Sequence, residues 1–207
     1  EVFELFWGNP SYGINGRGIS TSWDWASVQF FLMDNRTLRA PNRPRKRANP
    51  YFGNMQVNWL IDSLKKSTSD FKLITTGNQM LPVGFIPGEV YGKYRKEKKN
   101  LLRRIKKENI KGVIFISGDR HFSELSRKKR RGTYPLYDLT VSPLTSTPIS
   151  SELNFNYHRV NGTFVGKRNF ALLEFFNGEG GRMVKIGIYD SKGKVIWQKV
   201  ISLKDLS

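Results

Sequence analysis

The stretch Val113-Ile-Phe-Ile-Ser-Gly-Asp-Arg-His-Phe-Ser123 joins a strand to a group of reactive side chains. Its first five residues are mostly apolar and predict a buried strand, and a glycine then opens a turn that carries Asp119, Arg120 and His121. In open α/β sheets, ligands bind outside the carboxyl ends of the strands. The carboxylate and the imidazole could face one metal ion, and the guanidinium could neutralise an anionic substrate. The alternative is an ordinary strand-to-loop turn with a histidine at the surface.

Helices alternate with short apolar strands over the first part of the chain. The strands expected there are 28–33, 71–76, 113–117 and 137–141. The helices expected between them are 53–66 and 93–109. Strands with period-2 alternation then end the chain, at 169–175, 184–189 and 195–201. This order predicts an α/β fold with a largely parallel sheet and an antiparallel tail. The first 25 residues are expected to form a loop.

Composition indicates a globular protein without disulfides. Apolar residues make up 38% of the 207 residues and aromatic residues 13%, which is enough to bury a core. The absence of cysteine excludes thiolate metal sites and cysteine nucleophiles. No run approaches the roughly 20 apolar residues of a membrane-spanning helix. The chain begins at Glu1 without an initiator methionine or a signal peptide, which indicates a start inside a longer protein.

The chain is strongly basic, with 35 Lys and Arg against 17 Asp and Glu, for a formal net charge of +18. Most of the excess lies in three segments: Arg43–Arg47, Lys93–Lys107 and Arg127–Arg131. The first and third are expected in loops, and the second on the outer face of an amphipathic helix. A field of this sign concentrates phosphate-bearing anions and nucleic acids. The alternative interpretation is a solvated surface with a basic bias.

Polar residues end three of the expected strands, at 34–36, 77–79 and 119–121. If these strands are neighbours, the polar residues converge on one edge of the sheet. Asp119, His121 and Asn78 would then supply a carboxylate, an imidazole and an amide, which are ligand types that hard metal ions accept. A turn-forming Asp34 and an ordinary loop residue at Asn78 are the structural alternatives.

Arginines near the same edge are candidates for phosphate binding. Arg36 and Arg39 could hold phosphate oxygens in a bidentate manner, as lysine could not. A salt bridge within the protein is the alternative role of Arg36. His158 is the only other histidine in the sequence, and we interpret it as a structural or surface residue. The sequence contains no phosphate-binding Gly-rich loop, nucleophile elbow or His-Glu-x-x-His pair.

Five segments together resemble the PhoD-like alkaline phosphatases, a family of the calcineurin-like metallophosphoesterases. The segments are Phe30–Arg36 with Arg39, Gln56–Leu60, Phe71–Ile74, Gly112–His121 and Tyr134–Thr145. The resemblance runs from about Trp7 to Trp197. It implies a four-layer αββα sandwich and a centre of two or more divalent or trivalent metal ions, with Ca, Fe, Mn and Zn not distinguished. It also implies hydrolysis of phosphate monoesters or diesters, as small substrates, through a metal-activated water.

The resemblance also assigns roles and a location. Asp119 and His121 match the late metal-binding motif of the family, and charge and position suggest that Arg36 and Arg120 face the phosphate. Family members are typically exported from bacterial cells, which implies a periplasmic, secreted or surface-anchored protein. The upstream Trp-Asp-Asp-His-Asp type segment has no counterpart before residue 28, where Trp23-Asp-Trp25 lacks a histidine.

Residues 1–207 are therefore expected to be the C-terminal part of a single phosphatase domain, and to bind at most one metal weakly and be inactive alone. Two alternatives stay open. One is a non-catalytic module that binds nucleic acid or another polyanion. The other is a degenerate member of the family that keeps the fold without a complete metal centre.

Overall fold

The computed structural model describes residues 2–40, 50–84, 88–150 and 155–207. Six strands form one mixed sheet, in the order β1-β2-β3-β4-β6-β5. They are β1 (Thr21–Trp25), β2 (Val28–Leu32), β3 (Phe71–Thr75), β4 (Val113–Ser117), β5 (Glu124–Arg130) and β6 (Thr133–Thr140). The four central strands run parallel, and β1 and β5 pair antiparallel at the two edges. The prediction of a largely parallel sheet is confirmed.

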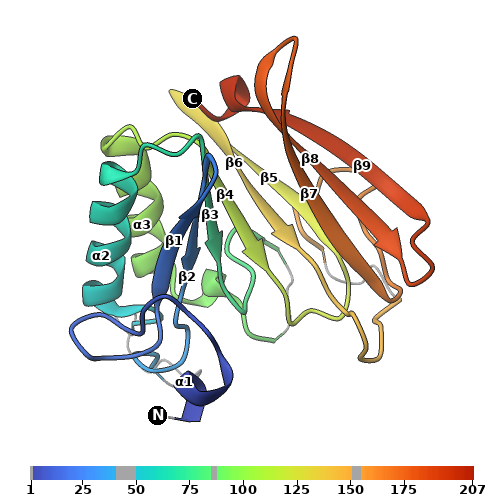
Figure 1. Ribbon diagram of the computed structural model, residues 1–207. Coiled ribbons are helices and arrows are strands. Elements are labelled where there is room, and N and C mark those ends of the chain that lie inside the picture. The colour runs from blue at the N-terminus through green and yellow to red at the C-terminus, as the bar shows by residue number, and fades with distance from the viewer. Residues whose placement is uncertain (1, 41–49, 85–87, 151–154) are drawn as a thin grey trace.

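Two helices cover one face of this sheet (Figure 1). They are α2 (Gly53–Lys66) and α3 (Arg95–Lys107), and α2 has the bounds that its apolar spacing predicts. Leu60 and Leu64 of α2 and Leu101 and Ile105 of α3 are buried in the core. Three short helices complete the set: α1 (Val2–Phe6), η1 (Tyr91–Lys93) and η2 (Leu203–Leu206). Within the described ranges, no helix is both long and apolar enough to cross a membrane.

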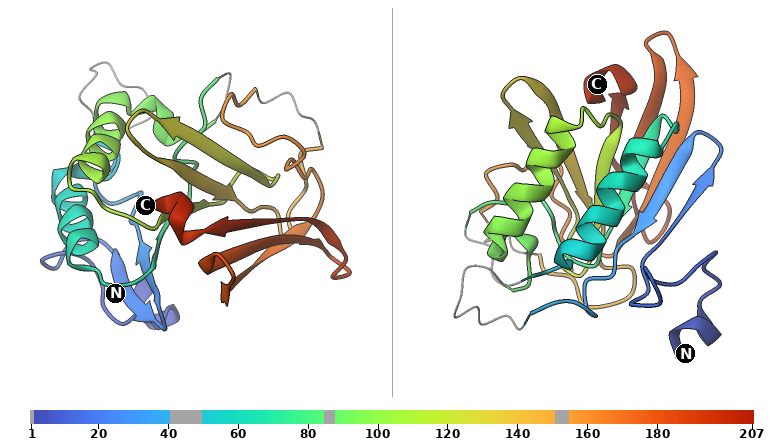
Figure 2. Two further views of the ribbon diagram at one scale, coloured as in Figure 1. Left: turned by 90° about the horizontal axis from the view of Figure 1, so that it is seen from above. Right: turned by 90° about the vertical axis from the view of Figure 1, so that its left-hand side faces the viewer.

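A second, antiparallel sheet packs against the other face (Figures 1 and 2). It contains β7 (Asn169–Gly178), β8 (Gly181–Asp190) and β9 (Val195–Ser202). Val184, Ile186 and Ile188 point from β8 into the shared core, and the rings of Phe71 and Phe175 lie 5.2 Å apart. The described residues therefore form a helix layer, a mixed sheet and a second sheet, in agreement with the predicted α/β sandwich.

The structure corrects two expectations about loops. Thr21–Trp25 was expected to be part of a loop but forms edge strand β1, where Trp23 stacks on Phe30 with 5.1 Å between the ring centroids. Arg127–Arg130 also lies in a strand, β5, and only Arg131 enters the following turn. Charged residues are common on edge strands because they discourage pairing with another chain. The third basic segment, Arg43–Arg47, lies outside the described residues.

One basic residue of α3 departs from the expected exposed face. Lys98 is buried, with only 8% of its surface exposed, and its Nζ donates a hydrogen bond to the carbonyl of Leu81 at 3.2 Å. Burial lowers the pKa of Lys98 from 10.5 to about 8; nearby Asp138 opposes this shift and Lys128 adds to it. Since the folded state binds the proton less tightly than the unfolded state, the charged Lys98 costs stability at neutral pH.

We expect the folded protein to gain stability over the Lys98→Met variant as the pH rises from about 8 to 10.5. The difference between the two pKa values corresponds to roughly 3 kcal/mol, which is an upper limit for this gain. Urea denaturation of both proteins at several alkaline pH values measures it. A difference between the two proteins that does not change with pH would contradict a lowered pKa at Lys98.

Candidate functional site

The three polar strand ends meet at one edge of the mixed sheet, as the sequence predicts. The loops after β2, β3 and β4 lie together at the lower end of Figure 1. Asn35 Nδ2 donates to Asn78 Oδ1 at 2.9 Å, and Asn78 Nδ2 donates to Asp119 Oδ2 at 2.9 Å. A continuous chain of hydrogen bonds therefore links the ends of three neighbouring parallel strands.

A buried tyrosine supports the middle of this chain. The hydroxyl of Tyr51 donates to Asn78 Oδ1 at 2.7 Å and accepts from Asn35 Nδ2 at 3.1 Å. Burial raises the pKa of Tyr51, so the hydroxyl keeps the proton that it donates. With Oδ1 of Asn78 accepting from two donors, the amide is fixed with its Nδ2 toward Asp119. Sequence reasoning missed Tyr51, because nothing local to an aromatic residue ahead of a helix marks it as part of a site.

Asp119 and His121 both have left-handed backbone conformations, with φ of 65° and 59°. Such conformations cost of order 1–3 kcal/mol each in residues other than glycine, and they are found preferentially at functional sites. Ser142 Oγ accepts from the amide of His121 at 2.7 Å, and the carbonyl of His121 accepts from the amide of Ile149 at 2.7 Å. These two hydrogen bonds hold the strained turn. The side chain of Asp119 is exposed and that of His121 is partly exposed.

The imidazole of His121 is held in a defined orientation. Its Nδ1 lies 2.7 Å from the carbonyl oxygen of Thr147, which can only accept, so Nδ1 carries a proton. In the neutral ring, Nε2 therefore has a lone pair, and Ser146 Oγ lies 3.4 Å from it. This arrangement is typical of a histidine that ligates a metal through Nε2 while Nδ1 donates to a carbonyl.

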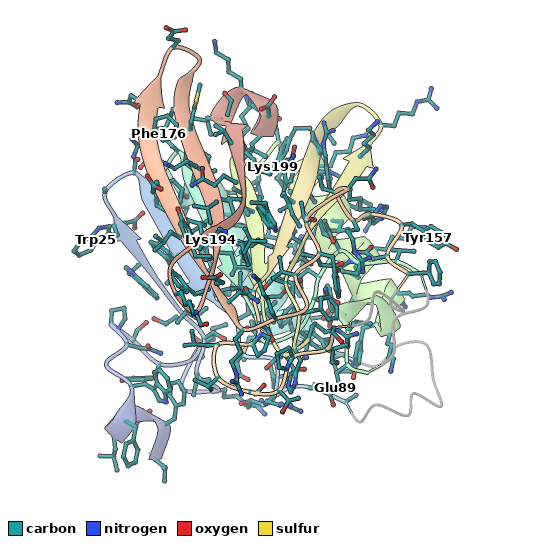
Figure 3. All side chains as sticks on the ribbon, turned by 90° about the vertical axis from the view of Figure 1, so that its right-hand side faces the viewer. Trp25, Glu89, Tyr157, Phe176, Lys194 and Lys199 are labelled. Carbon is teal, nitrogen blue, oxygen red and sulfur yellow. The ribbon has the colours of Figure 1, made fainter. Side chains whose placement is uncertain are left out.

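Of the two arginines after β2, one is exposed and one is not. The side chain of Arg36 is 72% exposed, and its Nη2 lies 3.5 Å from Glu89 Oε2. The side chain of Arg39 is only 6% exposed; it bonds to Glu89 at 2.8 Å and to the hydroxyl of Tyr94 at 3.2 Å. Figure 3 shows Glu89 at the same end of the molecule as the strand-end loops. Arg36 can therefore reach a ligand at this edge, whereas Arg39 braces the loop.

Arg120 lies in the interior instead of at the sheet edge. It is buried, with 9% of its surface exposed, and its guanidinium lies over the ring of Phe122, 5.4 Å from the centroid. Burial lowers the pKa of Arg120, although Glu124 and Asp119 favour the charged form. A Cβ at Gly88 would lie 2.9 Å from Nη1 of this arginine, so the guanidinium packs closely against that glycine.

The carboxylate of Asp34 serves the turn that follows β2. It accepts hydrogen bonds from the amides of Ile19, Arg36 and Thr37 and from the hydroxyl of Thr37, at 2.6–3.0 Å. Burial alone would raise the pKa of Asp34, but these hydrogen bonds outweigh it and the pKa is lowered. His158 lies away from this turn, with Nε2 3.2 Å from Lys128 Nζ.

The described residues provide part of a metal-ligand set. Asp119 and Nε2 of His121 have suitable donor chemistry, but across these ranges no group of three or more His, Cys, Asp and Glu could hold a metal ion. Asn78 could add its amide oxygen only by exchanging its hydrogen bonds with Tyr51 and Asn35. Protein metal sites of this kind have four to eight ligands, counting water, so two side chains are too few by themselves.

A mixed α/β sandwich with polar strand ends gathered at one edge is thus a class of fold built for ligand binding at that edge. The profile of the PhoD-like phosphatase family matches residues 19–183, and the chain therefore belongs to this family. The resemblance seen in the sequence is confirmed. Among curated protein sequences there is no significant match.

Two solved structures share the fold. One is that of PhoD, with a TM-score of 0.65 and 15% sequence identity over 89% of this chain and 44% of that one. The other is purple acid phosphatase PPD1 from yellow lupin (Lupinus luteus) seeds, with a TM-score of 0.50 and 14% identity over 89% of this chain and 32% of that one. These likenesses confirm the predicted fold class. The chain spans less than half of the length of the PhoD structure.

Proposed function

We propose that this chain is part of a metal-dependent phosphoesterase that hydrolyses phosphate monoesters or diesters. The observation that carries the proposal is the hydrogen-bonded convergence of Asn35, Asn78 and Asp119 beside His121, within the region matched by the PhoD-like family profile. The exposed carboxylate and the oriented imidazole are the groups suited to hold metal. Two or more divalent or trivalent ions, when bound, supply Lewis acidity that activates water and neutralises phosphate charge.

In this proposal each residue has a distinct task. Asp119 and His121 are metal ligands, and Asn78 either adds an amide oxygen or orients Asp119 through its Nδ2. Arg36 offers its exposed guanidinium to the phosphate oxygens. The buried Arg120 acts through its charge, since it lies beneath the surface behind Gly88. No residue of the chain is asked to form a covalent intermediate.

The remaining ligands of the proposed centre would come from outside the described residues. We propose that residues 1–207 are the C-terminal part of a single phosphatase domain, which is compatible with a match to 44% of the PhoD chain. By family resemblance we also propose a bacterial protein exported to the periplasm, the cell surface or the medium. The natural full-length protein is therefore the appropriate material for tests of activity.

Hydrolysis of p-nitrophenyl phosphate and bis-p-nitrophenyl phosphate by the full-length protein tests the proposal. We expect turnover of at least one of them, and a ratio between the two that reports monoesterase or diesterase preference. The net charge of +18 favours polyanion binding as a second candidate function. Nucleic-acid affinity that falls steeply with salt, combined with no turnover of either ester under any metal condition, would replace the first proposal by the second.

The support that Tyr51 gives to Asn78 leads to a further prediction. Tyr51→Phe removes the hydroxyl that holds the amide, and we expect turnover to fall by about 10- to 100-fold, as for other partners of metal ligands. The ring packing stays, so the melting temperature should change little. Kinetics with p-nitrophenyl phosphate measure the loss. Tyr12→Phe, at an exposed hydroxyl that bonds to Trp7, is the control, and equal rates in both variants would contradict a positioning role for Tyr51.

A further inference from the structure

A groove of about 880 Å³ lies on the side of α3 that faces the edge strand β5. Its walls come from the loop after β3, the first turns of α3 and Lys128 of β5. Helix α3 lies beside the β5–β6 hairpin (Figure 2, right), and Lys106 Nζ donates to the carbonyl of Arg131 at 2.7 Å. The volume falls within the range of small-molecule sites, which is about 300–1,000 Å³. None of the groups proposed for phosphate hydrolysis lines it.

The charge of the groove has one sign. Five cationic side chains line it and no carboxylate does: Lys93, Arg95, Lys98, Lys99 and Lys128. Within residues 2–40, 50–84, 88–150 and 155–207, no ion pair joins any of these five to a carboxylate. The like charges converge on a partly enclosed volume, so an anion bound there would relieve their repulsion.

Two of these lysines carry charge that the protein neutralises only in part. Lys98 is buried, and Asp138, the carboxylate that acts on it, accepts from the amides of Met80 and Leu81 at 2.7 and 2.8 Å. Lys128 Nζ lies 3.2 Å from Nε2 of His158, and burial followed by the charges of Lys128 and Lys98 lowers the pKa of that histidine. The imidazole is therefore a neutral acceptor and brings no counter-charge.

The rest of the lining is aliphatic. It comes from Pro82, Val83, Val90 and Leu102, together with two glycines. No aromatic side chain lines the groove, so a nucleotide base has no ring on which to stack. A ligand that matches both parts has a compact anionic head and an aliphatic body.

We propose that this groove binds an aliphatic phosphate or phosphonate, with its anionic head between Lys98 and Lys128 and its alkyl chain against Val83, Val90 and Leu102. The site is separate from the proposed hydrolytic site and does not depend on it. The same head group occurs free or on a lipid, and the two sources differ in whether a monomeric ligand suffices.

Calorimetric titration with octylphosphonate below its micelle concentration tests the proposal. The phosphonate cannot be hydrolysed as an ester, and chelator in the buffer removes metal-dependent binding. We expect one equivalent to bind, with affinity reduced at least about tenfold by Lys98→Met and by Lys128→Gln. Lys199→Gln, which removes the same charge from exposed β9, and Asp119→Asn should leave the affinity unchanged. Removing the buried charge of Lys98 is expected to stabilise the fold, and thermal melting verifies that each variant is folded.

Several results would overturn the proposal. Affinity unchanged in both groove variants would place the ligand elsewhere, and loss of binding in Asp119→Asn would assign it to the proposed hydrolytic site. Inorganic phosphate binding as tightly as octylphosphonate would remove the role of the aliphatic wall, and octyl glucoside binding as tightly would remove the role of the charge. Binding only to vesicles that contain anionic lipid, with no affinity for monomeric octylphosphonate, would replace the groove by a membrane-binding surface.

Discussion

Asp119→Asn in the full-length protein is expected to lower phosphoesterase turnover by roughly 10³-fold, because metal ions supply several kcal/mol of transition-state stabilisation. The substitution removes the negative charge of the proposed ligand and keeps its size. The left-handed backbone at this residue, with φ of 65°, is one that asparagine adopts readily, so the fold should be retained. The rate of p-nitrophenyl phosphate hydrolysis and elemental analysis of bound metal measure the effect together.

Asp62→Asn, on the exposed face of α2, is the matched control and should leave both the rate and the metal content unchanged. A full wild-type rate in Asp119→Asn would remove this carboxylate from the site. A normal metal content with a lost rate would make Asp119 a group that acts on substrate instead of a ligand.

Glu97→Ala is expected to destabilise the protein by roughly 2–4 kcal/mol, since it leaves several part-buried donors without their acceptor. Helix α2 begins at Gly53, and Phe52 at its N-cap provides no side-chain hydrogen bond. The carboxylate of Glu97, from α3, instead accepts from the amides of Tyr51, Phe52 and Gly53 at 2.9–3.1 Å. It also accepts from the hydroxyl of Tyr91 at 3.1 Å.

One side chain thus caps α2, joins it to α3 and fixes the backbone at Tyr51, which supports Asn78. Urea denaturation with an unchanged m-value measures the loss of stability. Lys96→Ala, on the exposed face of the same helical turn, is the control for helix propensity and should cost less than about 0.5 kcal/mol. A similar small cost for Glu97→Ala would show that water replaces the carboxylate without penalty.

The parts of the fold with regular apolar spacing could be predicted from the sequence. Helix α2 has the expected bounds, and β3 and β4 lie within a residue of theirs, because their burial follows directly from their periodicity. Strands β1 and β5 could not be predicted in this way. Strand β1 is dominated by the Trp23–Phe30 stack with its neighbour, and β5 carries a basic run that only its position at the sheet edge explains.

The candidate site shows the same division. The convergence of Asn78 and Asp119 follows from strands of known order, since polar ends of parallel neighbours share one edge. The support from Tyr51, the interior position of Arg120 and the burial of Lys98 depend on contacts between residues far apart in the chain. Charge and motif position therefore suggested the right part of the sheet but not which side chains face solvent.

The measurement that tests the central claim most directly is hydrolysis of p-nitrophenyl phosphate and bis-p-nitrophenyl phosphate by the full-length protein at alkaline pH, before chelation, after chelation and after return of single metal ions. We expect chelation to abolish turnover and at least one of Ca, Fe, Mn or Zn to restore it. The same cycle in His121→Ala should restore little, because the oriented imidazole is a proposed ligand. Turnover that persists in chelator, or its absence with every metal tested, would contradict a metal-dependent phosphoesterase site at this edge of the sheet.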